Sequence, residues 1–484
     1  MPLSLYSTLT RRLEPFGAPD RAGIYLCGPT VYMESHVGHA VGPVIVDALK
    51  RFLEFNGIRA LWVVNITDID DKLIRKSAET GASVREIADR HTALYRESLA
   101  RLGISGIDHF PRATDHVDGM HEMISGLVAK GLAYASGGDV YFDVRAFLEK
   151  KGDYGSLSNR QVDEMEGEGG TTAARKKSPL DFALWKAAKP GEPQWQSPWG
   201  PGRPGWHIEC SVMARRYLGD TLDVHAGGLD LVFPHHENER AQSEAATGKP
   251  FARFWMHNGL VRLKGEKMSK SLGNLVPLHR LLDEMPGEAL RFFLLSTHYR
   301  SPIDFASETL AASRKGLEGL HRTLERARKA LLAIPDEGLP PRAAFETLAA
   351  ESGPAAAPPD AAEPARAMLA ALDDDFNTGA ATGHLFRLSA GLNRILDANA
   401  AGEPAARAAR LLRLSGLLLG IFREPLRGAS DDTTLDALVA ILAEERASAR
   451  QRKDFAAADA IRTRLLDAGI VFEDRKGQTA WRRK

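Results

Sequence analysis

Two basic segments of the chain have residue types suited to binding a triphosphate. The first is His36-Val37-Gly38-His39, and the second, far along the chain, is Lys267-Met268-Ser269-Lys270-Ser271. After the first segment, apolar residues recur at helical spacing from Val41 to Phe52. His36 and His39 are therefore expected at the N-terminal end of an amphipathic helix, where free backbone N–H groups and the helix dipole favour anions.

Each segment has a part to play in phosphate chemistry. Gly38 allows a nucleotide to approach closely, and the two imidazoles can donate hydrogen bonds to phosphate oxygens. Lys267 and Lys270, flanked by Gly265 and Gly273, are expected to form a mobile cationic loop over the triphosphate. Such a loop would favour a reaction at phosphorus, because the rate of that reaction depends on how the reacting groups are positioned and on nearby positive charge. A lone His-x-x-His segment often marks only the start of a surface helix, but the two segments together favour a nucleotide site.

Four other residues have the donor atoms of a metal site. The only cysteines are Cys27 and Cys210, which do not suggest a disulfide framework. Cys27 ends an apolar run and is expected at the carboxyl end of a buried strand, the edge where α/β sheets bind ligands. In a helix starting near Pro234, His235 and Glu239 share a face. Two thiolates, an imidazole and a carboxylate suit tetrahedral zinc.

Two alternatives stay open at this point. Spacing alone does not choose between His235 and His236, since both lie within one helical turn of Glu239. Two buried cysteines without a metal are the other interpretation.

The order of apolar and polar segments predicts an α/β protein. Alternating strands and helices from residue 23 to 111 are typical of one half of a doubly wound parallel sheet, a Rossmann-like nucleotide-binding domain. The strand pattern is interrupted and then returns at Leu222-Asp223-Val224-His225 and between Trp255 and Val261. Beyond about residue 286 the periodicity becomes helical.

This pattern predicts five regions. They are the first half of the catalytic domain (1–111), a connective insertion (112–220), the second half with the lysine loop (221–285), an α-helical bundle (286–425) and a small C-terminal region (426–484). Within the bundle, the Ala/Pro-rich residues from about 335 to 364 are expected to form a flexible segment.

Composition narrows the class of protein. The 484 residues include 63 basic and 63 acidic side chains, so overall charge does not indicate nucleic-acid binding. No apolar run approaches the roughly 18 residues that span a bilayer, and the N-terminus lacks a signal-peptide core. A cytoplasmic enzyme is expected. The C-terminal stretch from Arg446 to Lys484 is locally basic, with 11 Lys and Arg against 5 Asp and Glu, which fits RNA contact or simply a solvated helix.

Together the segments resemble the class I aminoacyl-tRNA synthetases, with Val37 in place of the usual Ile, and in particular the cysteinyl-tRNA synthetases. The resemblance covers nearly the whole chain. Besides the two basic segments, it rests on residues 26–32 (LCGPTVY), 65–72 (NITDIDDK), 204–211 (PGWHIECS) and 233–239 (FPHHENE), and on the basic C-terminal tail.

The resemblance implies ATP-dependent activation of cysteine and its transfer to the 3′-terminal ribose of tRNA(Cys). It also implies one Zn²⁺ on Cys27, Cys210, His235 and Glu239, with His235 rather than His236 on the metal. Zinc binds a thiolate well and a serine hydroxyl poorly, whereas shape alone separates such near-isosteres by only about 10- to 200-fold.

The resemblance assigns roles to further residues. Asp230 and the backbone at Gly28 would hold the substrate ammonium, and Thr67, Trp206 and His225 would line the amino-acid pocket. ATP, with Mg²⁺, would be bound by His36, Gly38, His39, Lys267, Ser269 and Lys270, of which the two histidines and two lysines would stabilise the transition state. The C-terminal region would bind the anticodon, with Trp481, Arg482 and Arg483 on the RNA. A monomer is expected.

Two other functions are compatible with parts of this pattern. Relatives with the same catalytic core join cysteine to the amine of a sugar-inositol compound, but they do not need the helical and basic regions that follow residue 286. A non-catalytic tRNA-binding paralogue would be expected to have lost the catalytic or metal residues, which this chain retains. The chain departs from the family pattern at Val41, where members often carry a basic residue.

Overall fold

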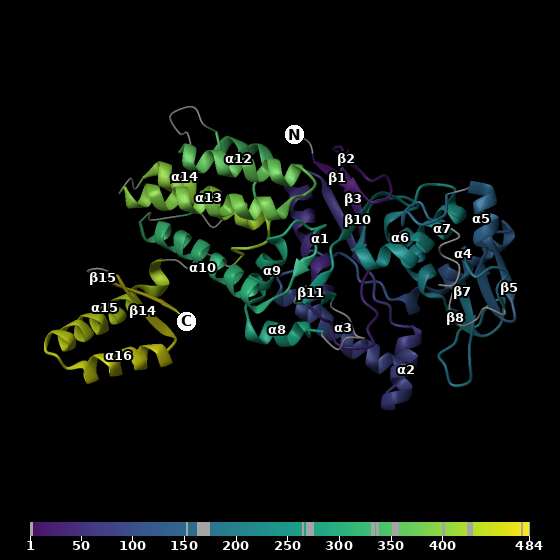
Figure 1. Cartoon of the computed structure of the whole chain (residues 1–484), viewed down its shortest axis with the longest axis horizontal. Coiled ribbons are helices and arrows are strands. Elements are labelled where there is room, and N and C mark those ends of the chain that lie inside the picture. The colour runs from purple at the N-terminus through teal and green to yellow at the C-terminus, as the bar shows by residue number, and fades with distance from the viewer. Residues whose placement is uncertain are drawn as a thin grey trace. The chain divides into compact units, whose positions relative to one another are not determined.

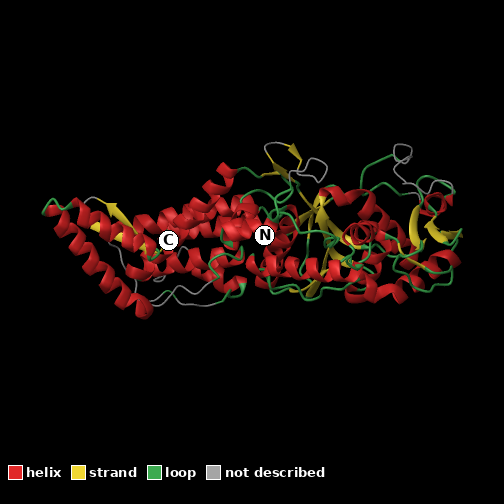
Figure 2. Cartoon of the chain, turned by 90° about the horizontal axis from the view of Figure 1, so that it is seen from below, coloured by secondary structure: helices red, strands yellow, loops and turns green. Residues whose placement is uncertain are grey.

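The computed structural model describes residues 3–151, 153–161, 175–263, 266–267, 275–330, 334, 338–350, 358–398, 402–423, 429–475 and 478–483. The chain divides into two compact units. The first contains residues 1–327 and 337–423, and the second contains residues 328–336 and 424–484. Strands form a few small sheets among the helices (Figure 2).

A four-stranded parallel sheet forms the centre of the first unit. Its strands lie in the order β10-β9-β3-β4, with every neighbouring pair parallel. Their bounds are β3 Arg21–Leu26, β4 Arg59–Val64, β9 Leu222–Gly228 and β10 Ala252–Asn258. The registers place the carboxyl ends of β3 and β4 side by side, since Leu26 pairs with Val64. This confirms the predicted Rossmann-like sheet, and its carboxyl edge is where a ligand is expected.

Helix α1 (Gly38–Phe55) follows β3 and carries the His36 segment at its start. Its apolar residues recur every three or four positions, and Val44, Leu49 and Phe52 are fully or almost fully buried. The predicted helix start at the histidines is therefore confirmed. Helices α2 (Asp71–Thr80) and α3 (Val84–Arg101) follow β4, and a hairpin of β1 (Ser4–Ser7) and β2 (Arg12–Pro15) precedes β3.

The insertion between the sheet halves is built around a second sheet, which is antiparallel and has the order β5-β6-β7-β8. In Figure 1, α4 and α5 gather around these strands, apart from β3 and β10 of the parallel sheet. The elements are α4 Val117–Ala129, β5 Ala133–Ser136, β6 Asp139–Phe142, α5 Val144–Lys151, β7 Phe182–Ala187 and β8 Gly202–Pro204, after a short 3-10 turn at Ala113–His116.

The chain returns to the parallel sheet through α6 (Trp206–Leu218). After β9, two short helical turns at Leu229–Leu231 and Val232–His236 lead into α7 (Glu237–Thr247). The predicted helix at Pro234 therefore begins with an irregular turn. His235 and Glu239 nevertheless share a face, with Nε2 and Oε1 2.8 Å apart. Strand β11 (Val261–Leu263) pairs with β12 (Glu266–Lys267) and with β13 (Ile303–Asp304).

Helices make up the rest of the first unit, as the periodicity predicts. They are α8 Leu278–Glu284, α9 Gly287–Leu295, α10 Ser307–Ala330, α11 Arg342–Leu348, α12 Pro359–Asp373, α13 Thr378–Asp397 and α14 Glu403–Leu418. The prediction of a flexible segment over 335–364 is wrong at α11 and at the start of α12. Phe345, Ala361 and Ala362 are completely buried there, so an apolar side chain every few positions suffices to anchor this Ala/Pro-rich sequence.

The second unit contains α15 (Ala429–Gln451), α16 (Phe455–Asp467) and an antiparallel ribbon of β14 (Ile470–Arg475) and β15 (Gln478–Arg483). Val439, Leu465 and Ile470 form its small core. Across the described parts of both units, no helix combines the length and the apolar character needed to cross a membrane.

Candidate active site and metal centre

A cavity of about 420 Å³ opens at the carboxyl edge of the parallel sheet. This volume lies in the usual range for ligand sites, roughly 300–1,000 Å³. Several of the segments that line the cavity follow a strand or start a helix, and Tyr95 reaches it from the middle of α3. The lining includes Cys27, Gly28, Tyr32, His36, Gly38, His39, Lys72, Tyr95, Trp206, Gly228, Asp230, Asn258 and Leu275. The predicted nucleotide and amino-acid residues are thus largely brought to one place.

The two histidines of the first segment are held by the backbone at the start of α1. The N–H of His36 donates to His39 Nδ1 (3.3 Å), and the N–H of Gly38 donates to His36 Nδ1 (3.2 Å). The rings stack with centroids 3.9 Å apart. A side chain on Gly38 would lie 2.9 Å from the His36 ring, so glycine is needed there. Because Nδ1 accepts in both rings, Nε2 carries the proton of the neutral form and can donate to an anion.

Both histidines are neutral at neutral pH. Burial lowers the pKa of His36, although the carboxylate of Asp230 works in the opposite direction. Burial, together with the smaller effects of His36 and Lys72, lowers the pKa of His39 to about 3. The pair therefore offers hydrogen-bond donors rather than positive charges to a phosphate.

The lysine segment falls on residues of which little is described. Ser269 and Lys270 lie outside the described residues, and of Lys267 only the backbone, in β12, is described. The chain that follows the loop pairs with the histidine segment. The N–H of Val37 donates to the Val276 carbonyl (3.0 Å), and the N–H of Leu278 donates to the Ser35 carbonyl (2.8 Å). The described chain that follows the lysine segment, from Val276 to Leu278, therefore lies beside the histidine segment.

Four side chains with metal-binding atoms converge beside the cavity. Cys27 Sγ lies 3.8 Å from Cys210 Sγ and 3.4 Å from Glu239 Oε1, and Cys210 Sγ lies 3.6 Å from His235 Nε2. For tetrahedral zinc with bonds of about 2.0–2.3 Å, ligand atoms should lie roughly 3.3–3.8 Å apart. The thiol contacts meet this requirement. Cys210, His235 and Glu239 are buried, so water does not compete for the site.

The charges of this cluster favour the binding of a cation. Burial raises the pKa of the Cys27 thiol well above its ordinary value, and Cys210 and Glu239 raise it further. Burial alone would lower the pKa of His235, yet Glu239 and Cys210 together raise it to about 10. The crowded acidic groups hold a proton on His235, and a divalent metal would take that proton's place.

A second set of four potential ligands overlaps the first and comprises Cys27, His225, His236 and Glu239. His236 uses both ring nitrogens, with Nδ1 2.8 Å from His257 Nε2 and Nε2 3.3 Å from Cys27 Sγ. His225 Nε2 lies 2.9 Å from Glu239 Oε2. Only the first set brings both thiols together. In that arrangement His225 contacts the second carboxylate oxygen of Glu239 and orients the carboxylate, as outer-shell partners of metal ligands do.

The predicted amino-acid residues fall into two layers. Gly28, Trp206 and Asp230 line the cavity, and Trp206 stacks on His235 with centroids 4.0 Å apart. Thr67 and His225 lie behind that lining and are almost completely buried. Thr67 Oγ1 donates to Glu209 Oε2 (3.1 Å) and accepts from Asn65 Nδ2 (3.2 Å).

Asn65 also fixes the turn that follows Cys27. Its Oδ1 accepts from the N–H of Gly28 (2.8 Å), and any side chain on Gly28 would meet the Asn65 carbonyl oxygen at 1.8 Å. Neither Asn65 nor Glu209 was predicted as a site residue. Their positions, directly after β4 and directly before Cys210, are the signals that sequence reasoning could have used.

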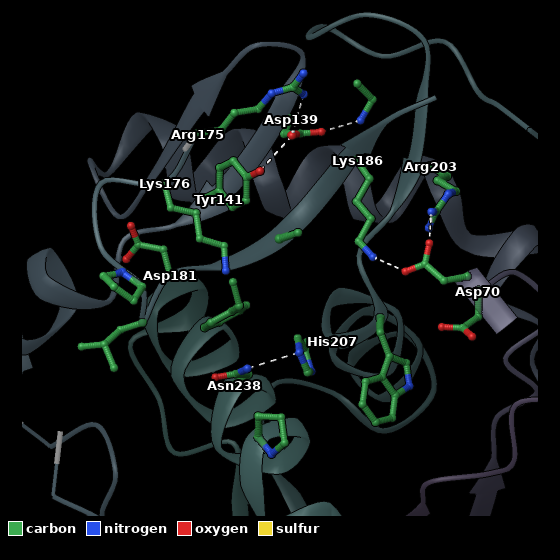
Figure 3. A pocket seen from close by; sticks show the side chains of 18 of the residues that line it. Asp70, Asp139, Tyr141, Arg175, Lys176, Asp181, Lys186, Arg203, His207 and Asn238 are labelled. Carbon is green, nitrogen blue, oxygen red and sulfur yellow. Dashed lines mark hydrogen bonds and ion pairs between the residues drawn. The ribbon is translucent and has the colours of Figure 1, made fainter. Parts of the chain in front are cut away.

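A second cavity of about 570 Å³ adjoins the first, and Trp206 lines both. Figure 3 shows Lys186, Arg203 and Asp70 on one side of it, and His207 and Asn238 below. Lys186 Nζ lies 2.7 Å from Asp71, and Arg203 pairs with the same carboxylate. Burial alone would raise the pKa of Asp71, but the two cations lower it to about 2. Strands β7 and β8 of the insertion are thereby tied to the start of α2.

Two imidazoles near the metal candidates were also not predicted. His207 Nδ1 lies 3.0 Å from His235 Nδ1, and His257 contacts His236. The predicted RNA contacts Trp481, Arg482 and Arg483 belong to β15, but their side chains lie outside the described residues.

Comparison with protein-family models gives three matches. Residues 15–315 match the model described as tRNA synthetases class I (C) catalytic domain, and residues 367–423 match the DALR domain. Residues 433–482 match the cysteinyl-tRNA ligase anticodon binding domain.

Curated relatives match over the full length. The cysteine–tRNA ligase of Syntrophobacter fumaroxidans is 44% identical over 508 aligned residues, covering 100% of both chains. That of Thioalkalivibrio sulfidiphilus is 45% identical, covering 99% of this chain and 100% of the relative. Among solved structures, Mycobacterium tuberculosis methionyl-tRNA synthetase in complex with methionyl-adenylate superposes with a TM-score of 0.59 over 83% of this chain and 90% of that chain. At 18% identity, this likeness shows a shared fold.

Proposed function

The chain belongs to the cysteine–tRNA ligase family of class I aminoacyl-tRNA synthetases, and we propose that its reaction takes place in the cavity at the carboxyl edge of the parallel sheet. There it joins cysteine to ATP and then passes the cysteinyl group to tRNA(Cys). The carboxylate of cysteine attacks the α-phosphorus, the bond to the β-phosphate breaks, and pyrophosphate leaves with Mg²⁺. A ribose hydroxyl of the tRNA then attacks the activated carbonyl, and AMP leaves.

One observation carries this proposal. The histidine pair of α1 and the thiol of Cys27 line the same cavity, so a phosphate-binding element and a thiol-binding element face one another. A nucleotide site alone would fit many enzymes, and a metal cluster alone would fit a structural site. Their meeting in one cavity fits a reaction between a triphosphate and a thiol-containing substrate.

The metal is proposed to be Zn²⁺, held by Cys27, Cys210, His235 and Glu239. When bound, it supplies a soft Lewis acid that favours a thiolate over an alkoxide, which separates cysteine from serine. The protein's own residues fix this site: Trp206 covers one face of His235, and His225 holds the second oxygen of Glu239.

The chain's polar groups hold ATP and the amino acid. The Nε2–H groups of His36 and His39 are proposed to donate to phosphate oxygens, with the Gly38 backbone close by. Lys267, Ser269 and Lys270 are proposed to close over the triphosphate, since the chain after their loop pairs with the histidine segment. Asp230, in the cavity wall, is suited to the substrate ammonium, together with the backbone at Gly28. Thr67 acts from the second layer by holding Glu209 and Asn65.

The tRNA is proposed to reach the second unit, because residues 433–482 match the anticodon-binding model. Trp481, Arg482 and Arg483 remain the proposed contacts, with Trp481 stacking on an unpaired base. The five regions predicted from the sequence remain the proposed domain division. A single chain acting in the cytoplasm is the expected form.

The decisive experiment is ATP-dependent charging of total cellular tRNA with labelled cysteine, with labelled serine as the control. We expect stable charging with cysteine only. Cysteine-dependent pyrophosphate exchange without charging would instead move the function to ligation of a small amine.

A further inference from the structure

The phosphate end of the cavity contains one side chain with a permanent positive charge. Among the described residues that line the cavity, Lys72 is the sole lysine or arginine. The remaining ionisable groups of the lining are acidic or are the histidines His36 and His39. Because burial lowers the pKa of both histidines, they contribute donors without charge.

Lys72 is close to the histidine pair. It lines the same cavity, and its charge is near enough to help lower the pKa of His39, behind burial and the charge of His36. Its ammonium also lies over the ring of Tyr32, 5.5 Å from the centroid. Tyr32 lines the cavity as well, so this contact keeps the ammonium on the cavity side.

The carboxylates next to Lys72 in the chain are already engaged. Asp70 caps α2 by accepting the backbone N–H of Lys72 (2.8 Å), and Asp71 pairs with Lys186 and Arg203. Figure 3 shows these two cations pointing toward the start of α2, beside Asp70. Within the described part of the chain, no carboxylate forms an ion pair with the Lys72 ammonium.

This arrangement holds the backbone from which the exposed side chain of Lys72 projects. The first turn of α2 is held from the insertion by Arg203, whose side chain is only 5% exposed, and from within the helix by the Asp70 cap. Lys72 is therefore a cation without an ion-pair partner, on a fixed backbone, beside two phosphate-binding donors. A triphosphate is the polyanion that such an arrangement suits.

We propose that the ammonium of Lys72 binds the phosphates of ATP during adenylate formation. The proposal rests on the proposed function only in taking this cavity as the ATP site. Lys72 is then a phosphate-binding residue that acts with His36 and His39, and it supplies a positive charge beside these two uncharged donors.

The test compares Lys72→Met with Lys76→Met. Lys76 lies one turn further along α2, pairs with Glu79 at 3.4 Å and does not line the cavity. Affinity for α,β-methylene-ATP is measured by calorimetry, and ATP-dependent pyrophosphate exchange gives the KM for ATP and for cysteine. Lys72→Arg, which keeps the charge, serves as the conservative variant.

We expect Lys72→Met to weaken analogue binding and to lower kcat/KM for ATP by roughly 10- to 100-fold, the usual range for losing a hydrogen bond to a charged group. The KM for cysteine should stay within about twofold of the wild-type value, and Lys72→Arg should recover most of the loss. Lys76→Met should behave as wild type. Lys72→Met and Lys76→Met make the same change on the same helix, so we expect them to affect folding equally.

Three results would overturn the proposal. Unchanged analogue affinity in Lys72→Met is the first, and an equal loss in Lys76→Met is the second. The third is normal exchange with reduced tRNA charging, which would assign Lys72 to the RNA instead. If the wild type showed no cysteine-dependent exchange, the proposed function would fail, while the calorimetric comparison would still decide whether Lys72 binds the triphosphate.

Discussion

At the scale of single residues, Cys210 is closely surrounded by other potential metal ligands. Its sulfur is buried and lies within 3.8 Å of both Cys27 Sγ and His235 Nε2. Replacing it with serine keeps the shape and removes the soft ligand. We expect Cys210→Ser to lose zinc and cysteine activation together.

The loss of zinc affinity should exceed the roughly 10- to 100-fold expected for changing an outer-shell partner such as His225→Gln. Metal content by atomic emission and cysteine-dependent pyrophosphate exchange would measure the two effects. Stoichiometric zinc in Cys210→Ser, or full exchange activity in a zinc-free variant, would contradict the assignment of this residue as a ligand.

Thr67 allows a second test at this scale. Its hydroxyl donates the hydrogen bond that the buried Glu209 accepts, so Thr67→Val leaves that carboxyl unpaired. We expect a loss of about 1–3 kcal/mol in the free energy of unfolding, and a raised KM for cysteine because the cavity floor shifts. Thr67→Ser keeps the hydroxyl and should retain both values. Denaturant unfolding and exchange kinetics measure them, and equal behaviour of the valine and serine variants would refute this role.

The sequence pointed to the candidate metal cluster more directly than to the layer behind it. Two cysteines in the whole chain are easily noticed, whereas the choice between His235 and His236 depends on which ring nitrogen faces the thiols. Both histidines face a thiol, since His235 Nε2 lies 3.6 Å from Cys210 Sγ and His236 Nε2 lies 3.3 Å from Cys27 Sγ. The set that contains His235 is favoured because it also contains both thiols. Thr67 and His225 were expected in the pocket wall. They lie one layer deeper because the turns at Gly28 and Gly228 come between them and the cavity.

At the scale of elements, a buried ion pair joins α1 to α9. Asp47 on α1 and Arg291 on α9 are at most 2% exposed, and their Oδ2 and Nη2 atoms lie 2.6 Å apart. The Nε–H of Arg291 also donates to the carbonyl of Leu419, directly after α14 (2.7 Å). Three helices therefore meet at one guanidinium.

Breaking this pair should be costly. Asp47→Ala leaves Arg291 buried without its charge partner, so we expect a loss of about 3–5 kcal/mol in the free energy of unfolding. The double variant Asp47→Leu with Arg291→Met removes both charges and should recover much of that loss. Denaturant unfolding would measure the series. If Asp47→Ala were as stable as the double variant, the ion pair would contribute little to the free energy of unfolding.

The same ion pair predicts that the free energy of unfolding falls at acidic pH. Burial alone would raise the pKa of Asp47, but the charges of Arg291 and Arg51 overcome this and hold the pKa below its ordinary value of 3.8. The unfolded carboxylate therefore takes up a proton first as the pH falls. The pair's stabilisation is complete above about pH 4 and is lost as the pH falls through the pKa of the folded state. Thermal unfolding between pH 3 and 6 should show a smaller acid effect in the double variant than in the wild type.

The elements were predictable where periodicity is strong. The strands of the parallel sheet and the helix after His39 follow from their buried apolar positions. The segment from 335 to 364 was not predictable in the same way, because alanine and proline are compatible with loops and with helix starts. Only the packing of Phe345 and of Ala361 distinguishes the two outcomes.

At the scale of the whole molecule, the two half-reactions should respond differently to salt. Overall charge is zero, but the stretch from Arg446 to Lys484 is basic, so RNA contact depends on a local excess of charge. Each phosphate neutralised by a protein cation releases counterions, which makes RNA affinity fall steeply with salt. Adenylate formation is proposed to take place in a cavity of the first unit, where few such contacts are expected.

We therefore expect kcat/KM for tRNA in the charging reaction to fall by roughly tenfold or more between 50 and 200 mM potassium chloride, as contact with a few phosphates implies. Cysteine-dependent pyrophosphate exchange should change by no more than about threefold over the same range. A short acceptor-stem duplex should show a shallower salt dependence than the full tRNA, because it lacks the anticodon that the basic second unit is proposed to bind. Equal slopes for the duplex and the full tRNA would mean that this unit adds no phosphate contacts, and the proposed anticodon role of its basic residues would be wrong.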